Sequence, residues 1–336
     1  MIRIDVLPDD VLLQIFDFYV DKNLIEAWHM LVHVCRRWRS LVFESPRRLN
    51  LRLFCTRKTP ARNMLNVWPA LPLFISGHIT LSSCVDNIIA ALEQSNRVCH
   101  VDLWGLEWKL DKVLAAMQVP FPELTHLSLA SGGLTPPVTP DLFLGGSAPR
   151  LQHFWLLAIP FPGLPKLLLS ATHLVYLSLR HIPRSGYISP EAMVALPSAL
   201  SSLETLILRL LFQYSQSRPD WESLHPPASK HSVMPALEYF DFQGVIEYFE
   251  DLITFIDAPQ LDDLRISFIN LIDFDCPRLS GHLLYLCCGA KPKNEEGIWE
   301  VTLMALLGPL CEFQLHPIHQ PYTNTRGLRC TCGILW

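Results

Sequence analysis

The sequence has little charge: Asp, Glu, Lys and Arg make up 18% of its 336 residues, against 50% hydrophobic residues. That balance excludes an intrinsically disordered chain, which combines low hydrophobicity with high net charge. The sequence also lacks an uncharged apolar run of the ~18 residues that span a bilayer. The longest candidates, residues 164–179 and 301–311, are interrupted by Lys166, His173 and Pro309 or are too short. Since the start of the chain lacks the basic and apolar segments of a secretory signal peptide, we expect an intracellular protein, in the cytoplasm or nucleus, without membrane contact.

Motifs typical of enzymes are missing as well. There is no Gly-rich phosphate loop, and the G-x-S-x-G motif of a serine hydrolase fails because Pro149 stands where the second glycine is required. His316, His319, Cys330 and Cys332 resemble a zinc site, but the C-x-C spacing is tighter than the usual C-x₂₋₄-C. The ten cysteines lie mostly in apolar runs, as expected of reduced, buried thiols. We therefore expect no catalytic activity, no cofactor and no metal, with a hydrolase as a distant alternative.

The first ~45 residues have the apolar spacing of three short helices. Pro8 fits a first helical turn, and Asp9 and Asp10 place negative charge at the positive end of the helix dipole. The helices are indicated by three apolar sets: Leu12, Ile15, Phe16 and Tyr19; Leu24, Ala27, Trp28 and Leu31; and Val34, Cys35, Trp38, Leu41 and Val42. So small a unit has too little interior to bury all these side chains. We expect a partner protein to cover part of them.

The order of three short segments in this region carries a family resemblance. Leu7-Pro8, then Ile15-Phe16, then "HVCRRWR" at residues 33–39 resembles an F-box. The resemblance implies a three-helix module that binds the Skp adaptor of cullin-type ubiquitin ligases. It places eight residues at or next to the adaptor-binding surface: Leu7, Pro8, Leu12, Ile15, Phe16, Val34, Cys35 and Trp38. The alternative is that these residues form the core of an ordinary helical hairpin.

A six-position pattern, apolar-x-x-apolar-x-apolar, recurs from residue 98 onward. Its seven copies are Val98-Val101-Leu103, Leu124-Leu127-Leu129, Leu151-Phe154-Leu156, Leu174-Leu177-Leu179, Leu203-Leu206-Leu208, Leu237-Phe240-Phe242 and Leu261-Leu264-Ile266. They begin 23 to 34 residues apart, close to the 20–29 residues of leucine-rich repeats. The fourth and sixth positions share one face of a strand, so the pattern predicts stacked parallel strands with helices behind them. Gly132, Ile159 and Ile182 occupy the usual Asn position in three copies, which favours an irregular array.

The predicted fold class is α/β, with an N-terminal three-helix F-box followed by an irregular leucine-rich-repeat solenoid. Parallel strands are expected on its concave side, and helices and loops on its convex side. The predicted domains are residues 1–48, the F-box; 49–97, a linker and the entry to the solenoid; 98–275, the repeats; and 276–336, an irregular C-terminal tail. The tail lacks a repeat cap, which favours an alternative or mispredicted exon end.

An F-box followed by irregular repeats resembles fungal F-box domain-containing proteins over residues 5–275. That resemblance implies a substrate-recognition subunit of an SCF-type ubiquitin ligase, which holds a protein target on its repeats while other subunits catalyse the reaction. The alternative is a leucine-rich-repeat scaffold outside ubiquitination, in which the helices close the N-terminal end of the solenoid.

Strand geometry, independently of the resemblance, selects a target-binding surface on the concave side. The positions that face away from the predicted core include His100, Asp102, Trp104, His153, Trp155, Tyr176, Tyr239, Asp241 and Arg265. Exposed aromatic residues often anchor protein interfaces, although a terminal helix or a loop inserted in one repeat would cover these. The basic cluster between Arg36 and Arg62 lacks interleaved aromatic residues, so we do not expect nucleic-acid binding.

Overall fold

A computed structural model describes most of the chain. The described residues are 7–21, 27–46, 49, 51–56, 61–79, 82–133, 137–186, 188–194, 200–210, 232–253, 255–268, 301–305, 311–318 and 327–334. The loop predicted as an insertion in one repeat, which contains Pro226 and Pro227 in the longest repeat interval, and the predicted second-helix residue Leu24 lie outside these ranges.

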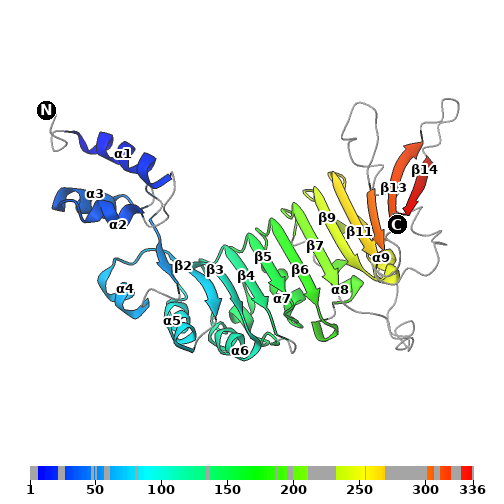
Figure 1. Ribbon diagram of the computed structural model, residues 1–336, viewed down its shortest axis with the longest axis horizontal. Coiled ribbons are helices and arrows are strands. Elements are labelled where there is room, and N and C mark those ends of the chain that lie inside the picture. The colour runs from blue at the N-terminus through cyan, green and yellow to red at the C-terminus, as the bar shows by residue number, and fades with distance from the viewer. Residues whose placement is uncertain are drawn as a thin grey trace.

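The N-terminal region is helical, as predicted. It contains α1 (Asp9–Asp21), α2 (Ala27–Val32) and α3 (Arg36–Glu44). Pro8 precedes α1, and its carbonyl accepts a hydrogen bond from the backbone N–H of Leu12 at 3.0 Å. Asp9 and Asp10 lie in the first turn of α1, where their charge favours the helix dipole. In Figure 1 the three helices form one end of the molecule, next to the first strand.

A long sheet follows the helices. Its strands are β1 (Leu53–Cys55), β2 (Leu73–Ile79), β3 (Val98–Gly105), β4 (His126–Ser131), β5 (His153–Leu157), β6 (Tyr176–Ile182), β7 (Thr205–Leu210), β9 (Tyr239–Gly244), β11 (Asp263–Phe268), β12 (Val301–Ala305), β13 (Cys311–Ile318) and β14 (Gly327–Ile334). The strands lie in chain order and are parallel from β1 to β12, while β13 and β14 pair antiparallel. Two further strands, β8 (Ser232–Val233) and β10 (Ile256–Asp257), pair with each other.

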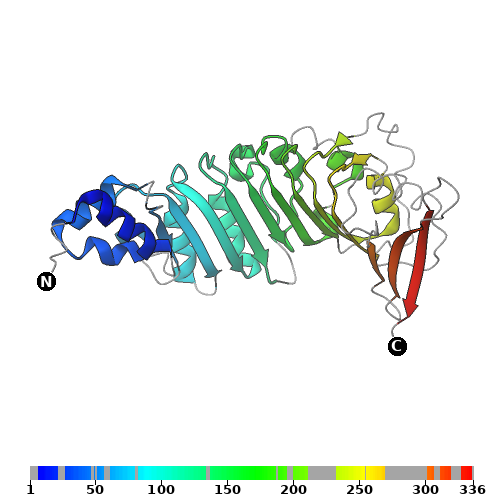
Figure 2. The same ribbon diagram turned by 90° about the horizontal axis from the view of Figure 1, so that it is seen from above.

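Helices cover one face of this sheet. They are α4 (Ala61–Val67), α5 (Ser82–Leu92), α6 (Glu107–Ala116), α7 (Leu164–Leu168), α8 (Pro190–Val194) and α9 (Ile246–Ile253), with the 3-10 turns η2 (Phe143–Gly146) and η3 (Arg184–Gly186). Figure 1 shows α5 and α6 on the outer side of a sheet whose two ends rise toward the opposite side, and Figure 2 shows the strands side by side from above. The sheet face opposite the helices is therefore the concave one.

The core lies between the strands and these helices. Each copy of the six-position pattern forms a strand, and its fourth and sixth residues are buried; Leu127 and Leu129 on β4, for example, have 0% exposure. In-register neighbours such as Val101 and Leu127 continue the core from strand to strand. Complete burial of one such side chain stabilises the fold by about 1.5–3 kcal/mol, which one repeat alone could not achieve. Ile159, in a position where leucine-rich repeats usually have Asn, is also fully buried.

These observations confirm the α/β class and the parallel sheet with an N-terminal helical region. The sheet begins earlier than residue 98, because the segment expected to be a linker and the entry to the solenoid contains β1, α4, β2 and α5. Leu49, Leu51 and Leu53 are buried, so this segment is packed against the core from its first described residues. The C-terminal region expected to be irregular contains β12, β13 and β14. Assignment to the leucine-rich-repeat class stays a prediction.

Candidate functional site

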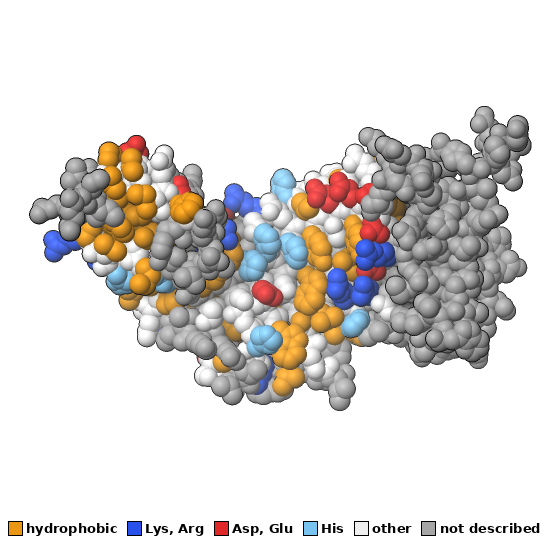
Figure 3. All heavy atoms as spheres, turned by 45° about the horizontal axis from the view of Figure 1, so that its top comes forward, with side chains coloured by type: hydrophobic (Ala, Val, Ile, Leu, Met, Phe, Trp, Pro, Cys, Tyr) orange, Lys and Arg blue, Asp and Glu red, His pale blue; other side chains and the backbone are white. Residues whose placement is uncertain are grey.

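The concave face of the sheet displays side chains in rows that run across the strands. One row, set by the strand register, begins with Phe54 on β1 and Phe74 on β2 and continues through histidines on β3, β4 and β5 to Tyr176 on β6. A second row contains Asp102, Ser128, Trp155 and Ser178. Figure 3 shows histidine and hydrophobic side chains gathered on this face.

The first row forms a column of stacked rings. We call Phe74, His100, His126, His153 and Tyr176 the ring column. Successive ring centroids are 4.8, 5.2, 5.6 and 4.1 Å apart, and three of the four pairs are within 16° of parallel. These spacings match the ~4.8 Å between neighbouring strands, so the sheet register itself stacks the rings.

The histidines of the ring column favour the neutral state. Burial lowers the pKa of all three imidazoles, and neighbouring imidazoles lower the pKa of His100 and His153 further. Arg52 also lowers the pKa of His100 and His126, while Asp102 opposes the shift at His100 and His153. The column is therefore an uncharged, polar-edged surface at neutral pH.

One tautomer follows from the hydrogen bonds. The Thr125 hydroxyl donates its single hydrogen to the Cys99 carbonyl at 2.9 Å, since a carbonyl only accepts. The Nδ1 of neutral His126, 2.9 Å from the same hydroxyl oxygen, must then carry the proton and donate it. Its Nε2 is left as an acceptor.

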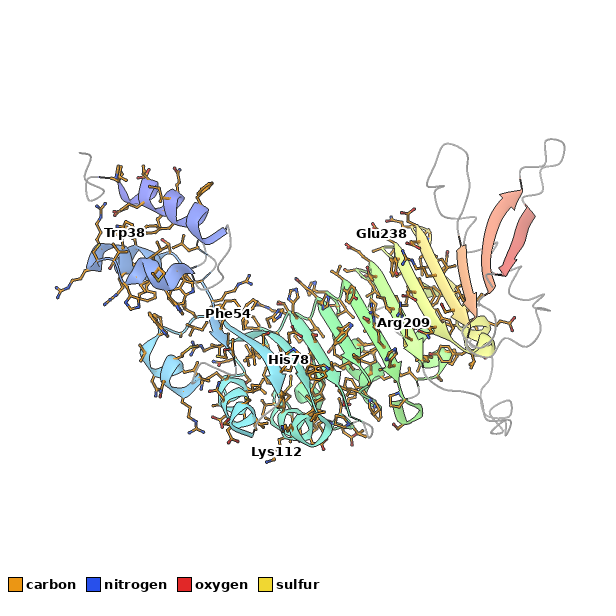
Figure 4. The ribbon with its side chains drawn as sticks, viewed as in Figure 1. Trp38, Phe54, His78, Lys112, Arg209 and Glu238 are labelled. Atoms are coloured by element: carbon orange, nitrogen blue, oxygen red, sulfur yellow. The ribbon has the colours of Figure 1, made fainter. Side chains whose placement is uncertain are left out.

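The part of the concave face formed by β6, β7, β9 and β11 carries charged side chains. Arg209 on β7 donates a hydrogen bond from Nη2 to Asp241 Oδ2 at 2.7 Å, and Asp241 is only 4% exposed. Arg180, the in-register neighbour of Arg209 on β6, donates from Nε to the Ser178 hydroxyl at 3.1 Å. On β11, Arg265 pairs with the carboxylate of Asp263 at 3.1 Å. Figure 4 labels Arg209 on the strands and Lys112 on the opposite, helix-bearing side.

The nine target-binding candidates therefore share the concave face but differ in exposure. Asp102, Trp104 and Arg265 are exposed, with Trp104 at 39%. The partly exposed candidates are His100, His153, Trp155, Tyr176 and Tyr239. Asp241 needs a correction: it is buried by its ion pair with Arg209, so it positions that guanidinium and is not itself available to a target.

The helical region is tied together by specific contacts. Arg37 on α3 donates hydrogen bonds to the Asp9 carboxylate at 2.5 Å and to the Leu7 carbonyl at 2.6 Å, which fixes α3 against the start of α1. Trp38 packs on Phe16 with ring centroids 4.7 Å apart. These contacts join the first and third helices into one unit.

A second set of contacts joins this unit to the sheet. Trp28 on α2 is 1% exposed and donates from its indole nitrogen to the Arg52 carbonyl at 3.1 Å. Trp68, after α4, packs edge-on against Trp28 at 5.2 Å and stacks on His29 at 5.0 Å. The helices are thus docked on the first strand through aromatic rings.

Large apolar side chains stay exposed on the helical region. They are Ile15 at 42%, Phe18 at 65%, Met30 at 65% and Val34 at 58% exposure, and we call them the apolar helical face. Figure 3 shows a hydrophobic patch over this end of the molecule. Exposed apolar side chains gathered in one small region are typical of a protein-binding surface.

Comparison with known protein families assigns this region. Residues 4–52 match the model of the F-box-like family. The match covers α1, α2 and α3 of this chain. No curated protein matches the chain.

Within the F-box-like domain, the eight adaptor-binding candidates separate into two groups. Pro8, Ile15, Val34 and Cys35 are exposed, and Leu7 and Trp38 are partly buried. Leu12 and Phe16 have 0% exposure, so they lie beneath the exposed candidates and support them from the core. Their helical spacing marked them as apolar but could not tell the core side of α1 from its outer side.

Sequence reasoning did not select Phe18 and Met30, although both are as exposed as Val34. Phe18 widens the apolar stripe of α1, which was the available signal.

Among the described residues, no helix is long and apolar enough to cross a membrane, and no cluster of His, Cys, Asp and Glu has the arrangement of a metal site.

Proposed function

We propose that this protein is the substrate-recognition subunit of an SCF-type ubiquitin ligase. Its F-box-like domain would bind a Skp-type adaptor and, through it, a cullin, while the concave sheet face would hold a protein marked for ubiquitin-dependent degradation. F-box proteins are typically adaptors without catalytic activity of their own, and the ligase complexes work in the cytoplasm or nucleus. The proposal keeps an F-box at residues 1–48 and a leucine-rich-repeat array, entered through residues 49–97, as the target-binding region.

The observation that carries the proposal is the apolar helical face within an F-box-like domain. Four large apolar side chains at 42–65% exposure are costly to leave in water, and a partner would cover them. Beneath them Leu12 and Phe16 are anchored in the core, so the face has a rigid support.

The sheet face supports target binding for a different reason. Side chains on it are held in place before any partner arrives: the ring column is stacked, and Arg209 is fixed by buried Asp241. Ordering these side chains in advance lowers the entropy lost on binding. Exposed Trp104 and partly exposed Trp155 supply the aromatic anchors that interfaces favour.

Adaptor binding is tested by co-expressing the full chain with the Skp adaptor and capturing the complex. In the double variant Ile15→Asp with Val34→Asp, two charges enter the apolar helical face without disturbing buried residues. We expect at least about a 30-fold loss of adaptor affinity, the equivalent of ~2 kcal/mol for an interface anchor. The matched control is Val67→Asp on α4, where an equally apolar side chain is 73% exposed outside the F-box-like domain. Retention of the adaptor by the double variant, or no capture by the wild type, refutes the proposal.

A second candidate function has one specific observation in its favour. The contacts of Trp28 and Trp68 seat the helices on the first strand, as a cap that closes the N-terminal end of a repeat scaffold would be seated. A cap of this kind needs no adaptor. Capture of the adaptor by the wild type therefore separates the two functions.

A further inference from the structure

The concave face holds two charged side chains that have no charged partner within the described part of the chain. Asp102 on β3 is exposed and makes no hydrogen bond or ion pair with another described residue. Arg180 on β6 has a hydroxyl partner, Ser178, but no carboxylate. Two other charge pairs lie on this face, Asp241 with Arg209 and Asp263 with Arg265, and the guanidinium of Arg52 lies 4.2 Å from the centroid of the Phe74 ring.

The surroundings of Asp102 favour a cation. In-register Ser76 and Ser128 flank it, and His100 and Trp104 lie two residues before and after it on the same strand face. The indole of Trp104 reaches over β4, since a Cβ added at Gly132 would lie 2.9 Å from its ring. A carboxylate with an indole two residues away on the same strand face suits a Lys or Arg side chain, which can pair with the carboxylate and lie against the ring.

The surroundings of Arg180 favour an anion. Arg180 and Arg209 are in-register neighbours, and among the described residues the one carboxylate that pairs with either of them is that of Asp241. Asp241 is buried and committed to Arg209. A carboxylate from another protein would complete the charge balance at Arg180, whose guanidinium is already held by Ser178.

The separation of the two charges sets the spacing of a ligand. Arg180 lies three strands from Asp102 and two residues further along its strand. At ~4.8 Å per strand and ~3.3 Å per residue, their Cα atoms are roughly 16 Å apart, and the concave curvature brings the side-chain ends closer. In an extended peptide the residues that face the sheet are i, i+2 and i+4, and i to i+4 spans about 13 Å. Trp155, in the Asp102 row one strand before Ser178, would meet the middle residue.

We infer that the concave face binds an extended segment of the target protein with a basic side chain at position i, an apolar one at i+2 and an acidic one at i+4. The basic side chain pairs with Asp102, the apolar one packs on Trp155, and the acidic one pairs with Arg180. The inference rests on the proposed function, because it names the target chemistry of the same face.

The test is selection of random nine-residue peptides, displayed on phage, by the immobilised full chain. The wild type is expected to enrich the basic, apolar, acidic pattern at i, i+2 and i+4. Asp102→Lys should exchange the preferred basic residue for an acidic one, and Arg180→Glu the preferred acidic residue for a basic one. Because each reversal replaces attraction by repulsion, enrichment of wild-type peptides should fall about tenfold for each. Asp111→Lys and Lys112→Glu, exposed on α6 on the helix-bearing side, are the matched controls and should select as the wild type does (Figure 4).

The outcomes are separable. The inference is overturned if the wild type and both reversal variants enrich the same peptides. It is also overturned if the wild type enriches no peptide. The thermal unfolding midpoint of each variant is measured, and if one single reversal unfolds, the double variant Asp102→Lys with Arg180→Glu must select the pattern with both charges exchanged. Peptides that are lost with Trp155→Glu but show no charge preference overturn the inference while the proposed function stands. Adaptor capture on the same preparations reports the failure of the proposed function separately.

Discussion

Acidification should destabilise this protein through the ring column. His100, His126 and His153 have lowered pKa values in the folded state because they are partly buried, whereas in the unfolded chain each titrates near 6.5. Below pH 6.5 the unfolded state therefore binds more protons than the folded state. The stability that these histidines contribute is fully present above pH 6.5 and is lost as the pH falls toward their folded pKa values.

The size of the effect follows from linkage. One whole proton of difference gives a slope of about 1.4 kcal/mol per pH unit in the free energy of unfolding. The rings are only about half-buried, and solvent screens part of the interaction, so we expect about 0.5 kcal/mol per pH unit for each histidine and about 1.5 kcal/mol for the three together. Asp102 works against the shift and Arg52 reinforces it.

The measurement is urea unfolding followed by circular dichroism between pH 7.5 and 5. Carboxylates also respond to acid, so the informative quantity is the difference between variants. His126→Phe keeps a flat ring in the column but removes its central titrating group, and it should reduce the slope. The matched control is His173→Gln, which removes an exposed histidine that lies between α7 and β6 and outside the ring column. Equal slopes for the wild type and His126→Phe would refute the reasoning.

Two further predictions concern single residues. Burial raises the pKa of the Cys55 thiol to about 11, so iodoacetamide at pH 8 should alkylate exposed Cys35 at least tenfold faster than Cys55 in peptide mapping; equal rates contradict this. Gly145 and Gly146 both have positive φ, at 66° and 76°, but an added Cβ meets the backbone nitrogen of Pro120 at 2.9 Å only at Gly145. Gly145→Ala should therefore lower the free energy of unfolding by about 1–3 kcal/mol more than Gly146→Ala in urea titrations, and similar losses in both contradict the steric argument.

The regular part of the fold could be predicted from the sequence because one physical rule repeats. Within each strand, apolar residues such as Leu127 and Leu129 occupy every second position, and the same set recurs along the chain at a nearly constant interval. One strand cannot bury these residues alone, so neighbouring strands complete the core. The helical region followed from apolar spacing and from the start signal at Pro8. Both signals are local and strong.

The first two strands lie in the segment predicted as a linker and the entry to the solenoid, because their repeat signal was weaker. Leu49, Leu51, Leu53 and Cys55 alternate with other residues, which is a strand pattern, but they lie next to the helical region and outside the repeat interval. The burial of Asp241 could not be predicted either, since it depends on a guanidinium 32 positions away in the chain. Such pairings become visible only when the register of neighbouring strands is known.

The ring column also depends on the register of neighbouring strands. Histidines 26 and 27 positions apart showed no periodic hydrophobic signal, yet the register stacks their rings. The candidate sites were thus predicted as faces, while the contacts within them depended on three-dimensional alignment.

The position of β1 at the end of the sheet has a consequence for the integrity of the chain. In the described sheet, no further strand pairs with the backbone N–H and C=O groups at the outer edge of β1. Trp28 lies next to this edge and donates a hydrogen bond to the Arg52 carbonyl. Proteolysis that released residues 1–48 would expose the outer edge of β1 together with the buried leucines Leu49, Leu51 and Leu53. Such a remnant would present a template for uncontrolled strand addition between copies, and the attached helices thus also act as a safeguard against fibrillar self-association.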